Sequence, residues 1–175
     1  MRAVLCAVLI VMFAPWSTGA SAQPIGSPPA VPTGPACDPS LWAHVYAGMF
    51  GRPQDRLRVI SECVTVTGFI DPHHPPRPEK DGDWHVRVLL DPPFTRMLND
   101  RNLSGQFGDL VVEPVCSNPV TQRDTIEEGV CAGFNQQIYR PSMIGRHVQI
   151  TGVYVTDMDH GWNEIHPVTS IIPIP

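Results

Sequence analysis

Residues 147–172, HVQITGVYVTDMDHGWNEIHPVTSII, hold two predicted strands and the turn that joins them. The runs from His147 to Val155 and from Trp162 to Ile172 are both rich in β-branched residues, which favour strands. Pro167 interrupts the second run, as proline does at an edge or a bulge, and Gly152 in the first run is typical of a sharp bend in a barrel. This stretch therefore predicts the last two strands of a mainly β domain.

Three more predicted strands precede this pair. Residues 57–70 (LRVISECVTVTGFI) are β-branched and alternating, with Gly68 at a predicted bulge or bend. Residues 84–90 place apolar side chains on one face, and residues 110–115 form a third strand. A brief helix predicted over 121–129 falls between the third and fourth strands. Five strands in this order predict a small OB-like Greek-key barrel, and the strand count leaves a small sandwich as the alternative.

A single β-barrel domain is predicted to span residues 37–175 and to carry one or two short helices. Asp38 followed by Pro39 is typical of a helix start, and Gly51 is typical of a helix end. The apolar residues between them repeat at helical spacing, which predicts one amphipathic helix. Residues 94–102 predict a further helical turn.

The composition limits the class of protein. The chain has 175 residues, of which 42% are hydrophobic and 17% charged, so it is long enough for one domain with a core. Its 20 prolines argue against a helical bundle, because proline breaks helix interiors. With 12 Lys+Arg against 17 Asp+Glu, the net charge of -5 gives no positive surface for a phosphate backbone. We therefore expect no nucleic-acid partner.

The N-terminus predicts export. Arg2 precedes an apolar run over residues 3–14, and residues 20–22 (ASA) form a small-residue cleavage site, so residues 1–22 are a predicted signal peptide. The apolar run is shorter than the roughly 20 residues that span a bilayer, and we expect no membrane span after its removal. Residues 23–36 are rich in proline and form a predicted linker. We expect a secreted or periplasmic protein.

The cysteines agree with export. Cys37, Cys63, Cys116 and Cys131 remain after the signal peptide is removed, and four cysteines in an oxidising compartment predict two disulfides. Three connectivities are open, and we predict the sequential one, Cys37 with Cys63 and Cys116 with Cys131. A four-thiolate zinc site is the alternative, although the chain has no C-x-x-C spacing.

The polar residues of the last strand point to a site. Trp162, Glu164 and His166 are two residues apart and therefore share one face, opposite Ile165. We predict that the barrel presents this polar face and that these three side chains bind a ligand. His85 points away from the apolar side of its own strand and lies near this face if the two strands are neighbours.

If those polar faces meet, His85, His160, Glu164 and His166 form a predicted metal site, with one divalent ion such as zinc as the cofactor. Such an ion lowers the pKa of bound water to about 7 and makes hydroxide available for hydrolysis. The alternative is that the histidines only pair with neighbouring acids and that Asp157 fixes the turn through its backbone. No residue is assigned a catalytic role.

Other polar residues have two alternative environments each. Glu113 on the third strand faces either His85 or solvent. His73 and His74 lie in a proline-rich loop, where we expect solvent exposure and where metal binding is the alternative. The sequence has neither a G-x-S-x-G nucleophile motif nor a glycine-rich phosphate loop.

Four stretches resemble a family of uncharacterised exported bacterial proteins. They are residues 56–68, 81–85 (DGDWH), 108–116 (GDLVVEPVC) and 151–168, which ends in HGWNEIHPV. The resemblance extends over about residues 56–172. It implies a small secreted OB-like barrel and carries no catalytic residues.

The sequence thus predicts an exported binding or envelope-associated module without an assignable activity. Its expected partner is a small molecule or an envelope component. The alternative is a metal-dependent hydrolase that uses the His/Glu face of the barrel, with phosphodiester hydrolysis as a candidate reaction. The metal content of the purified protein distinguishes the two.

Overall fold

The computed structural model describes residues 34–175. The predicted signal peptide over residues 1–22 and residues 23–33 of the predicted linker lie outside the described residues. Five strands form the body of the fold. They are β1 (Leu57–Ile70), β3 (Trp84–Leu90), β4 (Leu110–Val112), β5 (His147–Asp157) and β6 (Asn163–Pro173).

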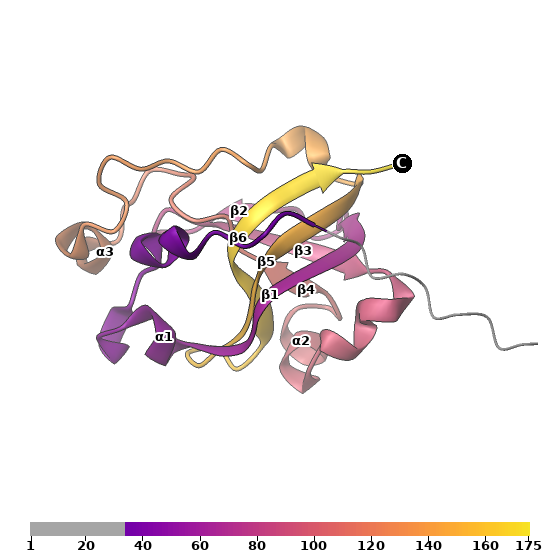
Figure 1. Ribbon diagram of the computed structural model, residues 1–175, viewed down its shortest axis with the longest axis horizontal. Helices are drawn as coiled ribbons and strands as arrows, with labels where there is room; N and C mark the ends of the chain where they lie inside the picture. The colour runs from indigo at the N-terminus through magenta and orange to yellow at the C-terminus, as the bar shows by residue number, and fades with distance from the viewer. Residues whose placement is uncertain (1–33) are drawn as a thin grey trace, which may run out of the picture.

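These strands close into a barrel (Figure 1). β1 pairs with β5, β5 with β6, β6 with β4 and β4 with β3, and β3 pairs back with β1. All of these pairings are antiparallel except that of β4 with β6. This is the order of an OB-like Greek-key barrel, which confirms the predicted fold class over a sandwich. A two-residue strand, β2 (Arg77–Pro78), lies beside the start of β3.

Short helices connect the strands and are more numerous than predicted. The α-helices among the described residues are α1 (Pro53–Arg56), α2 (Asp100–Gly105) and α3 (Arg123–Glu128). The 3-10 helices there are η1 (Pro39–His44), η2 (Gly48–Phe50), η3 (Pro92–Met97) and η4 (Pro141–Met143). Within residues 34–175, no helix has the length and apolar character needed to cross a membrane.

The predicted helix that follows Cys37 is instead two 3-10 turns. Its start is as expected, because the Asp38 side chain accepts a hydrogen bond from the Ser40 amide at 2.9 Å. Gly51 ends it in the left-handed region, with φ of 76°. Gly48 also has a positive φ, of 59°, and a right-handed helix cannot continue through that conformation. The spacing correctly placed Leu41 and Val45 in a core, but Met49 is 91% exposed and the single helix was wrong.

The barrel and its covering layer have separate apolar cores. The larger core draws residues from all five barrel strands, including Val86, Val112, Ile150 and Ile165. The second core lies where the η1 segment packs on the outside of β5. The N-terminal segment, indigo in Figure 1, thus runs across the barrel beside β6 and covers one side of it.

Two glycines allow the close approach of neighbouring strands. A Cβ added to Gly68 would lie 2.4 Å from the Leu89 carbonyl oxygen, at the point where β1 pairs with both β3 and β5. A Cβ added to Gly152 would lie 2.5 Å from Ile165 Cγ2, where the register of β5 and β6 shifts. Gly152 therefore lies at an irregular position of the kind that the sequence predicted, whereas Gly68 lies in regular register where β1 is shared between β3 and β5.

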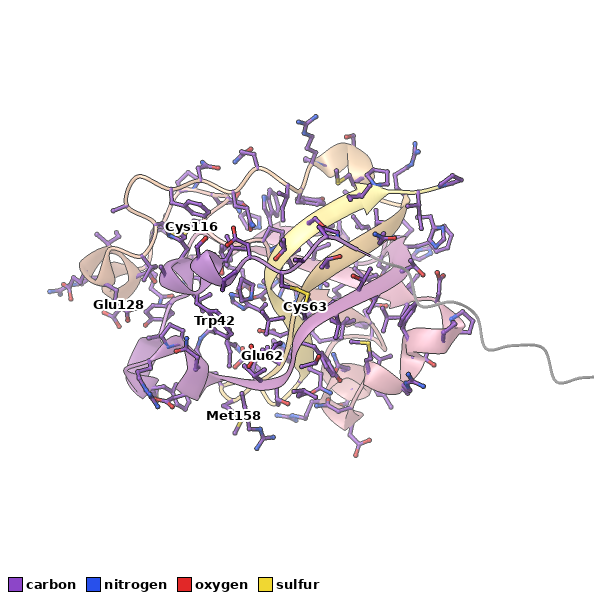
Figure 2. The ribbon with its side chains drawn as sticks, in the orientation of Figure 1. Trp42, Glu62, Cys63, Cys116, Glu128 and Met158 are labelled. Carbon is purple, nitrogen blue, oxygen red and sulfur yellow. A yellow bond between two sulfur atoms is a disulfide. The ribbon has the colours of Figure 1, made fainter. Side chains whose placement is uncertain are left out.

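The structure contains two disulfides, and they confirm the predicted sequential pairing. Cys37 with Cys63 joins the chain before η1 to β1. Cys116 with Cys131 closes a loop in the connection between β4 and β5. Figure 2 shows Cys63 on β1 and Cys116 at a distance from it, so the two bridges brace different parts of the molecule.

Candidate functional site

The polar face of β6 is buried. Ile165 belongs to the barrel core, and Glu164 and His166 point to the other side, as the alternation predicted. Both of these polar residues are 0% exposed, so the barrel does not present this face to solvent. Val155, which pairs with Glu164, packs against Leu41 in the second core. The N-terminal layer therefore covers the face that we expected to be open.

His166 is surrounded by three carboxylates. Its Nδ1 lies 3.0 Å from Glu113 Oε2 and 3.1 Å from Glu164 Oε1. Its Nε2 lies 3.3 Å from Asp83 Oδ2, yet this nitrogen makes no hydrogen bond to any described residue. The other oxygen of Asp83 accepts a hydrogen bond from the Cys116 amide at 2.7 Å. Asp83, Glu113 and His166 thus bring potential ligand atoms within 4.8 Å of one another.

His85 lies on the other side of Glu113. Its Nδ1 is 3.1 Å from Glu113 Oε1 and 3.5 Å from Glu79 Oε1. These three residues form a second group whose potential ligand atoms lie within 4.8 Å of one another. Glu113 therefore connects the two histidines, one through each oxygen. Of the two positions that the sequence left open for Glu113, the structure has the one facing His85.

Gln106 determines which nitrogen of His85 carries a proton. Gln106 Oε1 accepts a hydrogen bond from Arg87 Nε at 2.8 Å and lies 3.0 Å from His85 Nε2. Because a guanidinium only donates, the amide atom between them is the acceptor oxygen, and His85 Nε2 must donate to it. In its neutral form the imidazole then directs the lone pair of Nδ1 at the carboxylates of Glu79 and Glu113, whereas in its protonated form Nδ1 donates to Glu113. Arg77 Nη2 lies 3.1 Å from Glu79 Oε1 and neutralises part of this group, but the lone pair of His85 Nδ1 and the facing Glu113 Oε1 still need a proton or a cation between them.

We call Asp83, His85, Glu113, Glu164 and His166, with Glu79 at the edge, the buried centre. Acids outnumber bases here and in its immediate surroundings. The carboxylates are those of Glu79, Asp81, Asp83, Glu113, Asp157 and Glu164, and the basic side chains are those of Arg56, Arg77, His85, His160 and His166. Even with every imidazole protonated, the negative charges exceed the positive ones.

The pKa values reflect this crowding. Burial raises the pKa of Asp83 to about 7, and burial together with the nearby negative Glu113 raises the pKa of Glu79 to about 7. Burial acts in the same direction on Glu113, but hydrogen bonds from His166 and His85 outweigh it and hold the pKa of Glu113 well below its ordinary value. Burial opposes the charged form of His166, and the surrounding carboxylates overcome it, so the pKa of His166 is raised well above 6.5.

An open pocket of about 520 Å³ lies beside the buried centre and is lined by Arg56, Glu79, Asp81 and His160, among others. Glu79 belongs to both, since it lines the pocket and faces His85. Arg56 is only 5% exposed. Its Nε donates to the Tyr46 carbonyl at 2.9 Å and its Nη1 lies 3.6 Å from Asp157, whereas its Nη2 has no partner among the described residues.

The residues predicted from the sequence occupy different parts of this region. His85, Glu164 and His166 belong to the buried centre, and Trp162 Nε1 donates to Glu164 Oε2 at 2.9 Å. His160 is not among them: its ring stacks on Trp162 with centroids 4.3 Å apart, and its side chain is 51% exposed.

The turn before β6 has the hydrogen bonds of the alternative interpretation. His160 Nδ1 lies 2.7 Å from Asp157 Oδ2, and the Asp159 amide donates to Asp157 Oδ1 at 2.7 Å. Asp157 thus fixes the turn and orients His160 toward the pocket that it lines.

Sequence reasoning missed Glu79, Arg56 and Gln106, and it did not assign Asp83 to the site. The D-G-D-W-H run was a signal for Asp83, because it places two acids directly before His85. The chain has no match among protein-family models, curated proteins or solved structures. Its function is therefore inferred from the geometry of the site.

Proposed function

We propose that this protein is an exported binding module that holds a divalent metal ion between Glu79, His85 and Glu113. A small anionic molecule is its proposed ligand, bound in the adjoining pocket. One imidazole and two carboxylates form a ligand set suited to a first-row divalent ion such as zinc or manganese.

The observation that carries this proposal is the hydrogen bonding of His85. Its Nε2 is committed to Gln106, so Nδ1 is left to face two carboxylate oxygens at 3.1 and 3.5 Å. Metal-binding histidines commonly donate their second ring nitrogen to such a neighbour, which fixes the tautomer and the ring orientation. A cation at Nδ1 relieves the repulsion among the three acceptors and offsets the excess of buried carboxylates.

The charge of the pocket ligand follows from Arg56. Arg56 is one of the residues that line the pocket, and its buried Nη2 has no partner among the described residues. A buried donor without a partner costs about 1–3 kcal/mol, and more for a charged group, so a carboxylate or phosphate oxygen is a favourable partner for it. With inorganic phosphate as the probe, Arg56→Gln is expected to weaken binding at least about 10-fold, the equivalent of one charge-assisted hydrogen bond. Arg58→Gln, at an exposed position on β1, is the matched control.

The metal is tested by elemental analysis of protein purified without chelator or metal-affinity resin. Glu113→Gln is expected to lower the number of bound zinc or manganese ions by at least one per chain. Glu62, labelled in Figure 2, is an exposed residue of β1, and Glu62→Gln is the control that keeps the wild-type number. Equal metal content in all three proteins, after saturation with zinc, would contradict the proposal.

Hydrolysis is the second candidate function, and the position of Glu79 favours it. Because Glu79 both faces His85 and lines the pocket, water on an ion held there is reachable by a pocket ligand. Metal-bound hydroxide would attack phosphorus in a phosphodiester, and the alkoxide would leave with a proton from water. Zinc-loaded protein that cleaves bis(p-nitrophenyl) phosphate, with loss of cleavage in Glu113→Gln, supports this function. Metal binding without cleavage would support the binding module and contradict hydrolysis.

Export is the remaining part of the proposal. Two disulfides are typical of oxidising compartments, which supports it. The predicted signal peptide and the resemblance to exported bacterial proteins favour the same location. N-terminal sequencing of the protein from the producing cells is expected to begin at Gln23. An uncleaved cytoplasmic chain with four free thiols would contradict export.

A further inference from the structure

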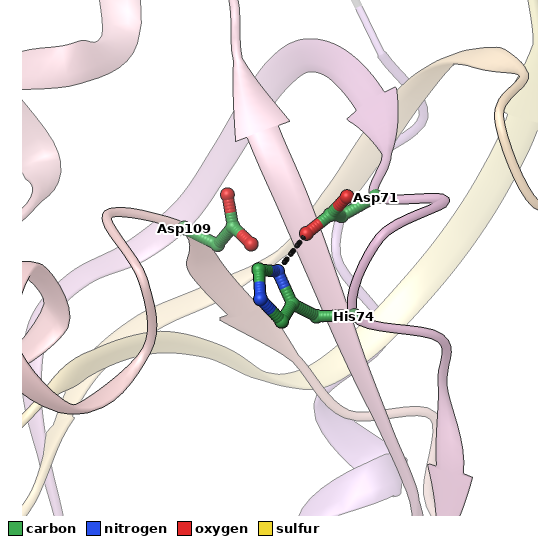
Figure 3. Close-up of side chains that lie close together, drawn as sticks. All are labelled: Asp71, His74 and Asp109. Carbon is green, nitrogen blue, oxygen red and sulfur yellow. Dashed lines mark hydrogen bonds and ion pairs between the residues drawn. The ribbon is translucent and has the colours of Figure 1, made fainter.

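A separate cluster lies at the far end of β1, outside the buried centre. Asp71 directly follows β1, His74 lies three residues further along the same loop, and Asp109 directly precedes β4. Figure 3 shows the three side chains turned toward one another. One potential ligand atom from each lies within 4.8 Å of the others. None of these residues belongs to the buried centre or lines its pocket.

Asp109 is the unusual member of this cluster. The residue is 0% exposed, and both of its carboxylate oxygens lack a hydrogen-bond partner among the described residues. Its backbone is held in place, because its amide donates to the Gln106 carbonyl at 3.0 Å and its own carbonyl accepts from Asn102 Nδ2 at 3.1 Å. A buried carboxylate without partners is costly unless a cation neutralises it.

Asp71 and His74 are already oriented. Asp71 Oδ1 accepts from the His73 amide at 2.7 Å, and Asp71 Oδ2 lies 2.5 Å from His74 Nδ1. The imidazole also stacks on Phe107, with ring centroids 3.7 Å apart. Phe107 has φ of 60°, which is uncommon for a bulky residue. The His74 side chain is 34% exposed, so an ion and its waters can reach the cluster from solvent.

We propose that Asp71, His74 and Asp109 form a second metal site, which binds one divalent first-row ion such as zinc or manganese. Two carboxylates and one imidazole are ligands that suit a first-row divalent ion, and water completes the coordination. The ion gives the buried oxygens of Asp109 a partner. It also ties the loop after β1 to the start of β4, which are far apart in the sequence.

A proton shared between the two carboxylates is the competing arrangement. Burial and the facing Asp71 raise the pKa of Asp109 to about 7, so one proton relieves part of the repulsion. An asparagine side chain imitates the protonated carboxyl in size and polarity. The variant Asp109→Asn therefore keeps the arrangement expected for a shared proton and removes the one expected for an ion.

The test is a calorimetric zinc titration of the metal-stripped protein. Asp109→Asn is expected to lose one binding event, or to weaken it at least ~10-fold, and His74→Ala to do the same. His74 is partly exposed, so the second variant tests the site even if the first fails to fold. Asp100→Asn, on the exposed start of α2, is the matched control that keeps every binding event.

The two metal proposals can fail independently. In Glu113→Gln, the Asp71–His74–Asp109 site is expected to bind its ion with unchanged affinity. Zinc binding that is lost in Glu113→Gln and unchanged in both Asp109→Asn and His74→Ala overturns this inference and leaves the buried centre intact. The opposite pattern supports the second site and contradicts the first.

Discussion

At the scale of single residues, Glu113 is the side chain on which the buried centre depends most. It stands between two imidazoles, with one oxygen 3.1 Å from His85 Nδ1 and the other 3.0 Å from His166 Nδ1. A carboxylate that satisfies both rings at once orients both. Removing its charge leaves two buried histidines among the remaining acids without the acceptor that they share.

We expect Glu113→Gln to lower the free energy of unfolding of the metal-free protein by about 3 kcal/mol. Breaking a buried ion pair by removing one partner typically costs this much, because the other charge stays buried. Urea denaturation at neutral pH measures it. Glu62→Gln, at an exposed position, is expected to change stability by less than about 0.5 kcal/mol. Equal stability of the two variants would show that Glu113 makes no net contribution.

The raised carboxyl pKa values predict an unusual pH dependence. Glu79, Asp83 and Asp109 have ordinary pKa values of 4.5, 3.8 and 3.8, and burial raises each to about 7. Between the ordinary pKa values and about pH 7, the folded protein binds more protons than the unfolded chain. Its free energy of unfolding therefore falls as the pH rises through this range. The raised pKa of His166 acts in the same direction, since its contribution is lost as the pH rises through its folded value.

The free energy of unfolding of the metal-free protein is therefore expected to be larger at about pH 5 than at about pH 8. Carboxyls with lowered pKa values, such as Glu113 and Asp157, lose their contribution only at lower pH. Chemical denaturation at several pH values, with chelator present, measures the slope. A stability that increases steadily from pH 5 to pH 8 would contradict the assignment of these protonation states.

The sequence could predict only some of these residues. Strand alternation placed Glu164 and His166 opposite Ile165, because a strand fixes the direction of every second side chain. Asp83 lies in a loop, where the local pattern gives no direction. Its position depends on tertiary hydrogen bonds, including that from the Cys116 amide. His160 was grouped with the other histidines, whereas its ring stacks on Trp162.

At the scale of elements, the strands were predictable and the covering layer was not. Five strand-like runs separated by turns, two of them with a clear period of two, are enough to indicate a small barrel. The N-terminal segment has helical spacing, yet the extended backbone of Val45 ends the first 3-10 turn and the second begins at Gly48, which has a positive φ. That this segment covers the polar face of β6 depends on contacts with residues far along the chain, which periodicity does not contain.

The bend of β5 provides a test at this scale. Gly152→Ala is expected to lower the free energy of unfolding by about 2 kcal/mol, because the new Cβ overlaps Ile165 Cγ2 and the Pro167 carbonyl oxygen, at 2.5 and 2.6 Å. Gly105→Ala is the control, since a Cβ at Gly105 in α2 meets nothing within 4 Å and alanine favours helix. Urea denaturation compares the two. A Gly152→Ala variant as stable as the control would show that the strands do not approach this closely.

At the scale of the whole molecule, the fold is a barrel covered on one side by an N-terminal segment that a disulfide attaches to it. The Cys37–Cys63 disulfide links the covering segment to β1, and Leu41 and Val45 pack on the barrel wall beneath it. The buried centre lies on the covered side. The cover therefore excludes water from the centre, while the pocket keeps Glu79 accessible.

Replacing both Cys37 and Cys63 by serine is expected to lower the free energy of unfolding by about 3 kcal/mol, given the 26-residue separation. Limited proteolysis is expected to cut the η1 and η2 segment before it cuts the barrel strands. Replacing Cys116 and Cys131 is the comparison, because that bridge has no covalent link to the covering segment and its loop contacts the segment only through non-covalent contacts such as the His44–Val130 and Ala47–Glu128 hydrogen bonds. Unchanged resistance of the N-terminal segment would contradict its dependence on the first disulfide.

The central claim is that the buried centre binds a divalent ion through Glu113. The most direct measurement is the zinc and manganese content, after saturation and gel filtration, of wild type, Glu113→Gln and Glu62→Gln. The account predicts that Glu113→Gln carries at least one ion per chain fewer than the other two proteins. Identical metal content in all three, or no bound ion in any of them, would contradict it and leave the centre a purely proton-bridged network.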